Sequence, residues 1–583
     1  MQREREMTKK PGLINLLSLA VICGFVIGFT QGFYFINANQ YLRYGMFRLV
    51  ALSFAEEINR WVILSVGLLS GITVIIILIS VCLKSLNKRK DFKNTGIMVV
   101  LRTFISAERG AVKKWAFGLV VSGIILNLGI FIDGIVNAPQ GPNVILISVD
   151  TLRADHLGCY GYDFDTSPNI DKFSRESVMF ENAKCQINWT LPSHISFLTS
   201  LYPSVFKKWT ANSSALEDKY LMLAEIMRNY RYKTAAFTAG VWLTKKYGFK
   251  QGFDCFVDNV KPTNIENIFN KFGINWIKRQ KNKFFVFLHC YEPHAPYDPP
   301  KPFKEKFACR YTPLSKLTPY HYNIGEDLGK TGENARKWFW KAKDKTTILK
   351  TIIGLYDGEI GYVDSEINKL FFRLKQLGLF DNTLIVFLSD HGEGFFEHDR
   401  FGHYNLYEEV RHVPLIILLP KSMQRYNKQI IQNLVGLVDV MPTILQICQI
   451  PYSEMPLQGV SLLDLIKGKG TFPNIISFSE NFELRVVSNL RYKYILSDYG
   501  KNNESETLFD LFTDPKESDN LLGGGIKDNR VRRVYLQLRM ELFRKLSKNS
   551  DLVKMFGAKI TLRKKSHLDK EMQEQFRSLG YLQ

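Results

Sequence analysis

Two acidic residues and a histidine that follow buried strands are the first candidates for chemistry. Asp150 ends the apolar run NVILISVD at 143–150, and Asp390 ends TLIVFLSD at 383–390, with His391 directly after it. In an open α/β sheet, ligands collect beyond the carboxyl ends of the strands, so these side chains should meet at one edge. Two carboxylates and an imidazole suit a divalent cation, which makes Asp150, Asp390 and His391 candidate metal ligands.

Thr190, in the stretch NWTLPSHISFLTS, is the candidate nucleophile. Pro192 suits the first turn of a helix, so Thr190 should lie at or just before a helix start. A threonine at that place can simply cap the helix with its hydroxyl. The unpaired N–H groups of a helix start also favour an oxyanion, and a neighbouring cation would activate the hydroxyl for attack. The stretch by itself leaves both interpretations open.

Five of the ten histidines fall in two segments that follow predicted strands. His289 and His294 lie in HCYEPHAPYDPP, and His391, His398 and His403 lie in HGEGFFEHDRFGHYNLYEE. Such clustering at one edge of a sheet indicates substrate contact or proton transfer, because imidazole is the commonest general acid–base group. Any single histidine among them can instead be structural, and His289, nearest its strand, is the best candidate for that role.

From residue 143 onward the chain alternates apolar runs with helical patterns. Apolar runs without polar alternation, separated by helical segments such as 357–378, indicate a doubly wound, mostly parallel α/β sheet covered on both faces. The predicted strands are 143–150, 233–240, 283–290, 383–390 and 412–420. A basic, poorly periodic insertion at 300–350 is expected to form a loop over the site.

The pattern changes after Ile476. Residues 489–498 and 506–512 alternate in the manner of strands, and the amphipathic stretch 531–546 follows them. This order predicts a small antiparallel sheet with a helix packed on it. We therefore expect a catalytic core at 137–475 and, at 476–583, a C-terminal subdomain with a tail.

Three long apolar stretches precede the catalytic core and predict a membrane domain at 1–136. The stretches 13–36, 62–83 and 115–136 are each close to the roughly 20 residues that cross a bilayer. The segment 84–114 between the last two carries nine Lys or Arg against two acidic residues. The positive-inside rule then places this segment and the N-terminus in the cytoplasm. Three crossings would deliver the catalytic core to the outside of the cell membrane.

The formal net charge of +21 suits an anionic partner. A basic external domain favours an anionic small-molecule, lipid or glycan ester as substrate, or an anionic membrane face. Nucleic acid is not expected as a partner, because no recognised binding motif occurs and the domain faces outward.

Motifs along the chain resemble the sulfatase family, within the alkaline phosphatase superfamily. The strings NVILISVDTLRADHLGCYGY, WTLPSH and SDHGEGFFEH occur in the family's order, and LFDLFTDPKESDNL resembles its C-terminal subdomain. The resemblance covers nearly all of residues 143–545. It implies the α/β fold already inferred and metal-assisted attack by a side-chain nucleophile on a sulfate or phosphate ester.

The resemblance also implies roles for single residues. The implied ligands of one divalent ion (Mn²⁺, Mg²⁺, Ca²⁺ or Zn²⁺) are Asp150, Thr190, Asp390 and His391. The implied catalytic residues are Thr190 as nucleophile and His294 and His403 as substrate-contacting or proton-donating groups. His194 and His289 are assigned to substrate binding.

The chain departs from the family at the nucleophile. Sulfatases carry Cys-x-Pro-Ser-Arg, whose cysteine is oxidised to formylglycine, or a serine in some bacterial enzymes, whereas this chain has Thr190-Leu-Pro-Ser-His194. Threonine is not a substrate for that oxidation, so no formylglycine is expected. Threonine nucleophiles occur in phosphodiester-handling relatives such as lipoteichoic acid synthases and phosphoethanolamine transferases, which are membrane-anchored.

These features together predict a membrane-anchored, extracytoplasmic, metal-dependent ester hydrolase or transferase that acts on phosphoesters. Two enzymatic alternatives stay open: a sulfatase of anionic glycans, and a phosphoethanolamine- or phosphoglycerol-type transferase. A non-enzymatic relative that binds glycans or lipids is the remaining alternative.

Overall fold

The computed structural model describes residues 141–206, 215–258, 264–313, 339–469, 476–526 and 528–557. All of them belong to one compact unit, Pro139–Gln583. The three predicted membrane spans lie outside the described residues. Among the residues that are described, no helix is both long and apolar enough to cross a bilayer.

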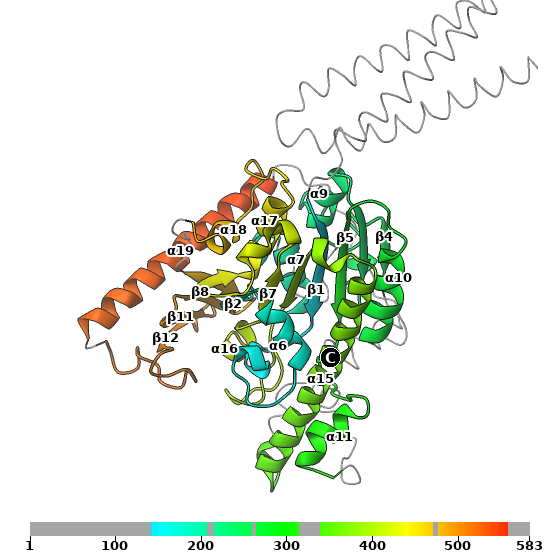
Figure 1. The fold of residues 1–583 in the computed structure, drawn as a ribbon. Coiled ribbons are helices and arrows are strands. Elements are labelled where there is room, and N and C mark those ends of the chain that lie inside the picture. The colour runs from blue at the N-terminus through cyan, green and yellow to red at the C-terminus, as the bar shows by residue number, and fades with distance from the viewer. Residues whose placement is uncertain are drawn as a thin grey trace, which may run out of the picture. The chain divides into compact units, whose positions relative to one another are not determined.

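An eight-stranded sheet forms the centre of this unit, in the order β4-β3-β5-β1-β6-β7-β2-β8 (Figure 1). The strands are β1 (Asn143–Val149), β2 (Val178–Lys184), β3 (Lys233–Phe237), β4 (Cys255–Val257), β5 (Phe284–Cys290), β6 (Thr383–Ser389), β7 (Leu415–Leu418) and β8 (Gln429–Gly436). The central strand β1 pairs in parallel with β5 on one side and with β6 on the other. The carboxyl ends of β1 and β6 therefore lie side by side.

The prediction of a mostly parallel sheet is confirmed, but one predicted strand runs the other way. β7, from the apolar run 412–420, is antiparallel to both of its neighbours, β6 and β2. The connection from β6 to β7 contains one short helix, α16 (Glu408–Arg411).

Helices cover both faces of the sheet, as the continuous apolar strands predict (Figure 1). In β1, Val144 and Leu146 face one apolar cluster, whereas Ile145, Ile147 and Val149 face the other. The first cluster is completed by α7 (Thr190–Thr199), α9 (Leu223–Asn229), α17 (Val440–Ile447) and α18 (Leu463–Ile466). The second is completed by α6 (Pro168–Arg175), α10 (Ile274–Ile277) and α15 (Lys345–Gln376). Burying each large side chain of β1 contributes roughly 1.5–3 kcal/mol, which holds the strand rigidly.

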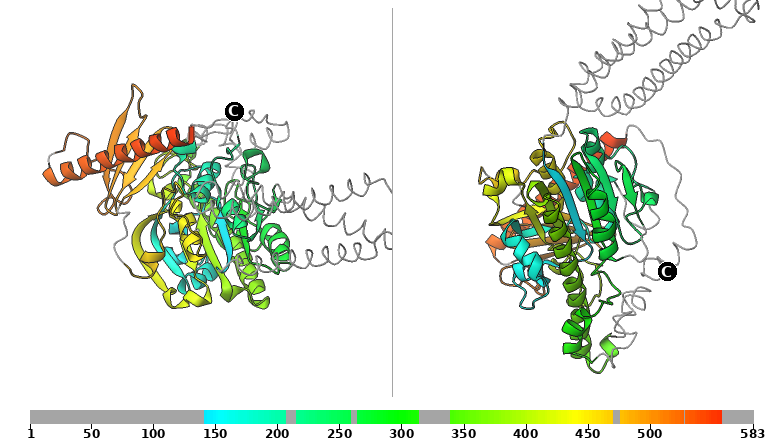
Figure 2. Two further views of the ribbon diagram at one scale, coloured as in Figure 1. Left: turned by 90° about the horizontal axis from the view of Figure 1, so that it is seen from above. Right: turned by 45° about the vertical axis from the view of Figure 1, so that its right-hand side comes forward.

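The described part of the insertion at 300–350 is helical rather than a loop. The helix α11 (Phe303–Phe307) packs on the amino-terminal half of α15, the long helix that Figure 2 shows at the front of its right-hand view. Glycine permits this close approach, because a Cβ at Gly354 would lie only 2.9 Å from the carbonyl oxygen of Phe307. The amphipathic pattern first recognised at 357–378 thus belongs to a helix that begins twelve residues earlier.

The C-terminal subdomain is a four-stranded antiparallel sheet in the order β12-β11-β10-β9. Its strands are β9 (Ser477–Glu480), β10 (Leu484–Ser488), β11 (Tyr492–Ser497) and β12 (Ser505–Asp510), and α19 (Asn529–Gly557) lies along one face (Figure 2, left). Leu538 and Leu542 of α19 join Phe478 and Val487 of the sheet in one apolar cluster. The small antiparallel subdomain with a packed helix is therefore confirmed.

Arg411 fastens this subdomain to the catalytic core. Its fully buried guanidinium donates to the hydroxyls of Ser477 at 2.6 Å and Ser479 at 3.0 Å, and to the carboxylate of Glu408 at 3.0 Å. Although burial opposes ionisation of Glu408, the cations of Lys184, Lys493 and Arg411 hold the pKa of its carboxyl well below its usual range. Because a buried charge without its partner is costly, the two sheets are held in one arrangement.

Candidate active site

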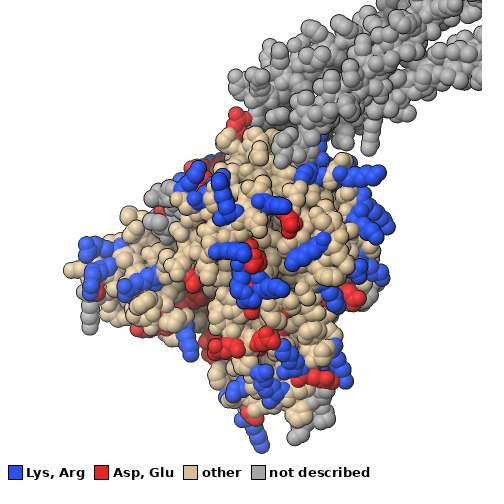
Figure 3. Space-filling model, in the orientation of Figure 1, with Lys and Arg blue, Asp and Glu red and all other residues tan. Residues whose placement is uncertain are grey.

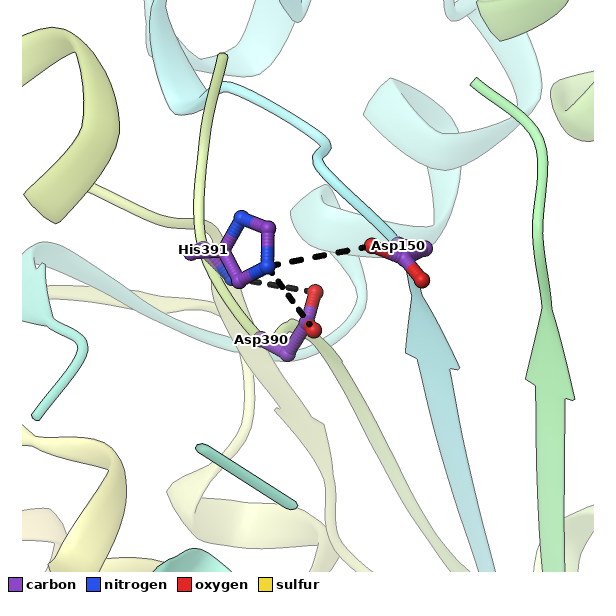
Figure 4. A group of neighbouring side chains, drawn as sticks. All are labelled: Asp150, Asp390 and His391. Carbon is purple, nitrogen blue, oxygen red and sulfur yellow. Dashed lines mark hydrogen bonds and ion pairs between the residues drawn. The ribbon is translucent and has the colours of Figure 1, made fainter. Parts of the chain in front are cut away.

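Two acidic residues and a histidine meet at the carboxyl ends of β1 and β6 (Figure 4). Asp150 follows β1, Asp390 and His391 follow β6, and all three are fully buried. Nε2 of His391 lies 3.4 Å from Oδ2 of Asp390 and 3.9 Å from Oδ1 of Asp150. One ligand atom from each residue lies within 4.8 Å of the other two. The structure therefore brings these three predicted ligands together, and we call them the acidic cluster.

The converging atoms of the acidic cluster are those left without hydrogen bonds. Oδ1 of Asp150, Oδ2 of Asp390 and Nε2 of His391 have no hydrogen-bond partner among the described residues. Of the other atoms, Oδ1 of Asp390 accepts from the N–H of His391 at 3.0 Å, and Nδ1 of His391 donates to the carbonyl of Gly392 at 3.0 Å. Three oriented, buried and unpartnered ligand atoms fit a divalent cation.

Electrostatics at the acidic cluster support this fit. Burial raises the pKa of Asp150 well above its usual range, and burial together with the charge of Asp150 does the same for the pKa of Asp390. Burial lowers the pKa of His391 to about 3, so its ring is neutral and can act as a ligand. Two buried carboxylates this close repel each other unless a proton or a cation lies between them.

Thr190 directs its hydroxyl at the acidic cluster. It is the first residue of α7, whereas Trp189 occupies the N-cap position and no side chain caps the helix. The buried hydroxyl Oγ1 donates to Oδ2 of Asp150 at 3.4 Å. The hydroxyl therefore contacts Asp150 and does not cap the helix.

His194 lies one helical turn after Thr190 and faces away from any surface. Its Nδ1 donates to the carbonyl of Thr190 at 2.7 Å, which leaves Nε2 to accept from the hydroxyl of Ser148 at 2.9 Å. The ring is fully buried. His194 thus contacts the backbone of Thr190, and its Nδ1 also lies 3.5 Å from Oδ2 of Asp390; its predicted contact with substrate stays a prediction.

His289, also assigned to substrate binding, lies in β5 beneath the acidic cluster. Its Nε2 is 3.5 Å from Oδ2 of Asp150, and the side chain is buried. Burial lowers the pKa of His289 to about 3, so the ring is neutral. The structure thus places His289 against a predicted metal ligand.

His294 and His403 border the acidic cluster from two loops. The ring of His403 lies 4.4 Å from that of His391 and 5.4 Å from that of His294, measured between centroids. Nδ1 of His403 donates to the carbonyl of Asn188 at 2.9 Å, and Nδ1 of His294 donates to the carbonyl of Ala295 at 2.6 Å. Burial lowers the pKa of each ring to about 3. Both predicted proton-transfer residues are therefore present at the site.

His398 lies outside the acidic cluster. It stacks on Tyr407 with ring centroids 3.5 Å apart, and it groups with Glu409 and Glu517 rather than with the acidic cluster. Sequence clustering alone could not separate it from its neighbours.

Three residues near the site were missed. The side chain of Asn188 donates to the carbonyl of His403 at 2.7 Å, and its position two residues before Thr190 is the only signal for it. Thr151 is a β-branched residue with φ of 54° and a buried, unpartnered hydroxyl, which indicates local strain. Glu393, in the SDHGE motif, is fully buried, and burial raises its pKa to about 8.

Comparisons with known proteins agree with this arrangement. The sequence profile of the sulfatase family matches residues 142–450, and that of the C-terminal region of N-sulphoglucosamine sulphohydrolase matches residues 396–548. An arylsulfatase of Clostridium perfringens is 26% identical over 463 residues, which cover 68% of this chain and 93% of the relative.

Solved structures show the same fold. The phosphonate monoester hydrolase of Agrobacterium radiobacter superposes with a TM-score of 0.56 at 20% identity, covering 70% of this chain and 96% of its own. A protein in complex with its substrate D-glucosamine-2-N,6-O-disulfate superposes with a TM-score of 0.58 at 19% identity, covering 71% of this chain and 99% of its own.

The resemblance found in the motifs is thereby confirmed, since one family profile spans more than half of the chain. Enzymes of this family bind a divalent metal ion, and the acidic cluster offers ligands for one. The chain belongs to the sulfatase family and is an enzyme of that family that acts on sulfuric or phosphoric esters.

Proposed function

We propose that the enzyme acts on phosphoesters through Thr190, as a hydrolase or as a transferase. The observation that carries this proposal is the hydroxyl of Thr190, which donates to Asp150 and does not cap its helix. A threonine can form and release a phosphoryl ester by in-line displacement. It cannot be oxidised to the aldehyde whose hydrate serves sulfatases.

In the first step, Oγ1 of Thr190 attacks phosphorus while its proton passes to Oδ2 of Asp150, the atom to which it is hydrogen-bonded. The bond from phosphorus to the leaving oxygen breaks as the bond to Thr190 forms. The backbone N–H groups at the start of α7 favour the charged oxygens of the transferred group. In the second step, water or an alcohol displaces Thr190 and restores its hydroxyl.

Asp150, Asp390 and His391, joined by Oγ1 of Thr190, would hold one divalent cation. When bound, it supplies Lewis-acid stabilisation of negative charge on the phosphoryl oxygens and of the Thr190 alkoxide.

His403 and His294 would exchange protons with the leaving and entering oxygens. Because Nδ1 of His403 donates to Asn188, Nε2 is the nitrogen without a proton in the neutral ring. When the ring is charged, that nitrogen can give its proton to the leaving oxygen in the first step, and it can then take a proton from the entering water molecule or alcohol in the second step. An anionic ester beside the ring raises its pKa, which favours the charged form during turnover.

A sulfate ester is the second candidate substrate. The names of the curated relatives, arylsulfatases, favour it, as does the sulfated glucosamine bound to one structural neighbour. The phosphonate monoester hydrolases among the structural neighbours favour the first candidate.

We further propose that the stretches 13–36, 62–83 and 115–136 anchor the enzyme in the cell membrane. The N-terminus would be cytoplasmic and the catalytic core extracytoplasmic, because the basic residues concentrate in the segment 84–114.

Replacement of Thr190 tests the nucleophile. Thr190→Ala should lower turnover of a phosphodiester on the order of 10³-fold or more, because the attacking oxygen is lost. Thr190→Ser keeps a hydroxyl and should retain measurable turnover. Rapid quenching and mass spectrometry should find a phosphoryl group on Thr190 in the wild type. Undiminished activity of the alanine variant would exclude the mechanism, and dominant sulfatase activity in that variant would favour the second substrate.

Replacement of His403 tests proton transfer. His403→Gln should slow esters with poor alkyl leaving groups by about 10²- to 10⁴-fold, because general acid assistance is lost. Esters with a nitrophenyl leaving group should lose much less. His398→Gln, outside the site, serves as the control. An equal loss of turnover for both kinds of leaving group would show that His403 is not the general acid.

Cation binding can be measured directly with Mn²⁺ by calorimetry. Asp390→Asn should weaken Mn²⁺ binding by about 100-fold or more, whereas Asp381→Asn, at an exposed position, should not change it. The raised pKa values of Asp150 and Asp390 mean that protons compete with the cation, so affinity should rise with pH. Mn²⁺ binding that is the same in both variants would show that the cation lies elsewhere.

Protease digestion of intact cells tests the topology. The catalytic core should be cut by a protease added outside, while an epitope fused to the N-terminus stays protected until the cells are permeabilised. A protected catalytic core would reverse the proposed orientation.

A further inference from the structure

A basic surface lies at the amino edge of the central sheet, opposite the site. The segment 228–233 leads into β3, and the segment 278–283 leads into β5. The two segments lie side by side, because the N–H of Lys233 donates to the carbonyl of Lys283 at 2.9 Å. They contain no acidic residue, and their basic residues are Arg228, Arg231, Lys233, Lys278, Arg279, Lys281 and Lys283. We call these two segments the basic edge.

The basic side chains of the basic edge are largely exposed to solvent. All seven residues are exposed except Lys283, which is half-buried. Among the described residues, no acidic group forms an ion pair with Lys233, Lys278 or Lys281. Two exposed acids lie at the same edge: Asp254, whose Oδ2 accepts from the N–H of Thr234 at 3.2 Å, and Asp381, just before β6. Lys and Arg side chains also gather on the surface around α9 and β4 in Figure 3.

The described chain begins at this same edge. Asn143 is in register with Thr383 of β6, and Lys233 pairs with Phe284 at the start of β5, beside β1. A Cβ on Gly141 would lie 2.6 Å from the hydroxyl of Tyr232, the residue between Arg231 and Lys233. The third proposed membrane span ends at residue 136, so only four residues separate it from Gly141.

We propose that the basic edge binds the anionic phospholipid headgroups of the membrane in which the enzyme is anchored. Clustered Lys and Arg beside a membrane span are attracted to anionic lipid within about a Debye length, ~8 Å at physiological salt. Four residues of extended chain reach at most about 14 Å, so the linker keeps Gly141 near the membrane surface.

Binding by the basic edge would orient the active site away from the bilayer. Asp150 and Asp390 follow the carboxyl ends of β1 and β6, whereas the basic edge lies at the amino ends of β3 and β5, which run parallel to them. The seven residues of β1 span roughly 23 Å at about 3.3 Å per residue. The site would then act on an ester that projects beyond the headgroups, such as a surface glycan or polymer, rather than on a headgroup beside the anchor.

Lysine footprinting of the full chain in lipid nanodiscs tests this proposal. Discs of phosphatidylcholine alone and discs that also contain phosphatidylglycerol are treated with an acetylating reagent, and the acetylated lysines are quantified. Lys233, Lys278 and Lys281 should react several-fold more slowly in the anionic discs, and 1 M salt should remove the difference. Lys341, Lys343 and Lys350, exposed before and within the amino-terminal part of α15, should react equally in both discs.

Two triple variants supply the matched comparison. Lys278→Glu/Arg279→Glu/Lys281→Glu should abolish the lipid-dependent protection of Lys233, whereas Lys341→Glu/Lys343→Glu/Lys350→Glu should preserve it. Equal reactivity of Lys233 in both kinds of disc would overturn the proposal, as would failure of the chain to insert into discs, since it rests on the proposed anchoring. Turnover of a soluble ester in the same samples reports separately on the catalytic proposal.

Discussion

The structure depends on one electrostatic constraint: Asp150 and Asp390 are buried next to each other with an oxygen of each left unpartnered. The effective penalty for burying an unpaired ion is several kcal/mol, so such a pair persists only if a proton or a cation compensates it. The rigid apolar strands β1 and β6 fix both carboxylates, and His391 completes the set of ligand atoms. A site built in this way is organised before substrate arrives, because the fold and not the ligand positions the charges.

The position of the proposed nucleophile, Thr190, depends on the same pair of carboxylates. Thr190 reaches Asp150 because α7 begins at the site, and His194 binds the carbonyl of Thr190 from one turn further along the helix. In sulfatases an arginine stands at the position of His194, and a cysteine stands at the position of Thr190. The two residues that differ from the sulfatase pattern, Thr190 and His194, contact each other. Together they replace an oxidisable cysteine with an alcohol, and a charged arginine with a neutral imidazole ring.

Much of the fold and of the site was predictable from the sequence. Fully buried strands appear as uninterrupted apolar runs, and an acid at the end of two such runs predicts a shared edge, as Asp150 and Asp390 show. The edge strand β8 and its neighbour β2 escaped prediction because QIIQNLVG and VMFENAK mix polar with apolar residues. The direction of β7 depends on how its connection crosses the sheet, and the burial of His194 depends on packing across α7. Neither the direction of β7 nor the burial of His194 can be predicted from the local sequence pattern.

The proposed mechanism requires that Asp150, Thr190, Asp390 and His391 bind one cation jointly. Anomalous X-ray diffraction from crystals of the full chain grown with Mn²⁺ tests it most directly. We expect one anomalous peak within about 2.3 Å of an oxygen of each carboxylate, of Nε2 of His391 and of Oγ1 of Thr190. A peak held by His294 and His403 without Asp150 and Asp390, or no peak at the ends of β1 and β6, would contradict it.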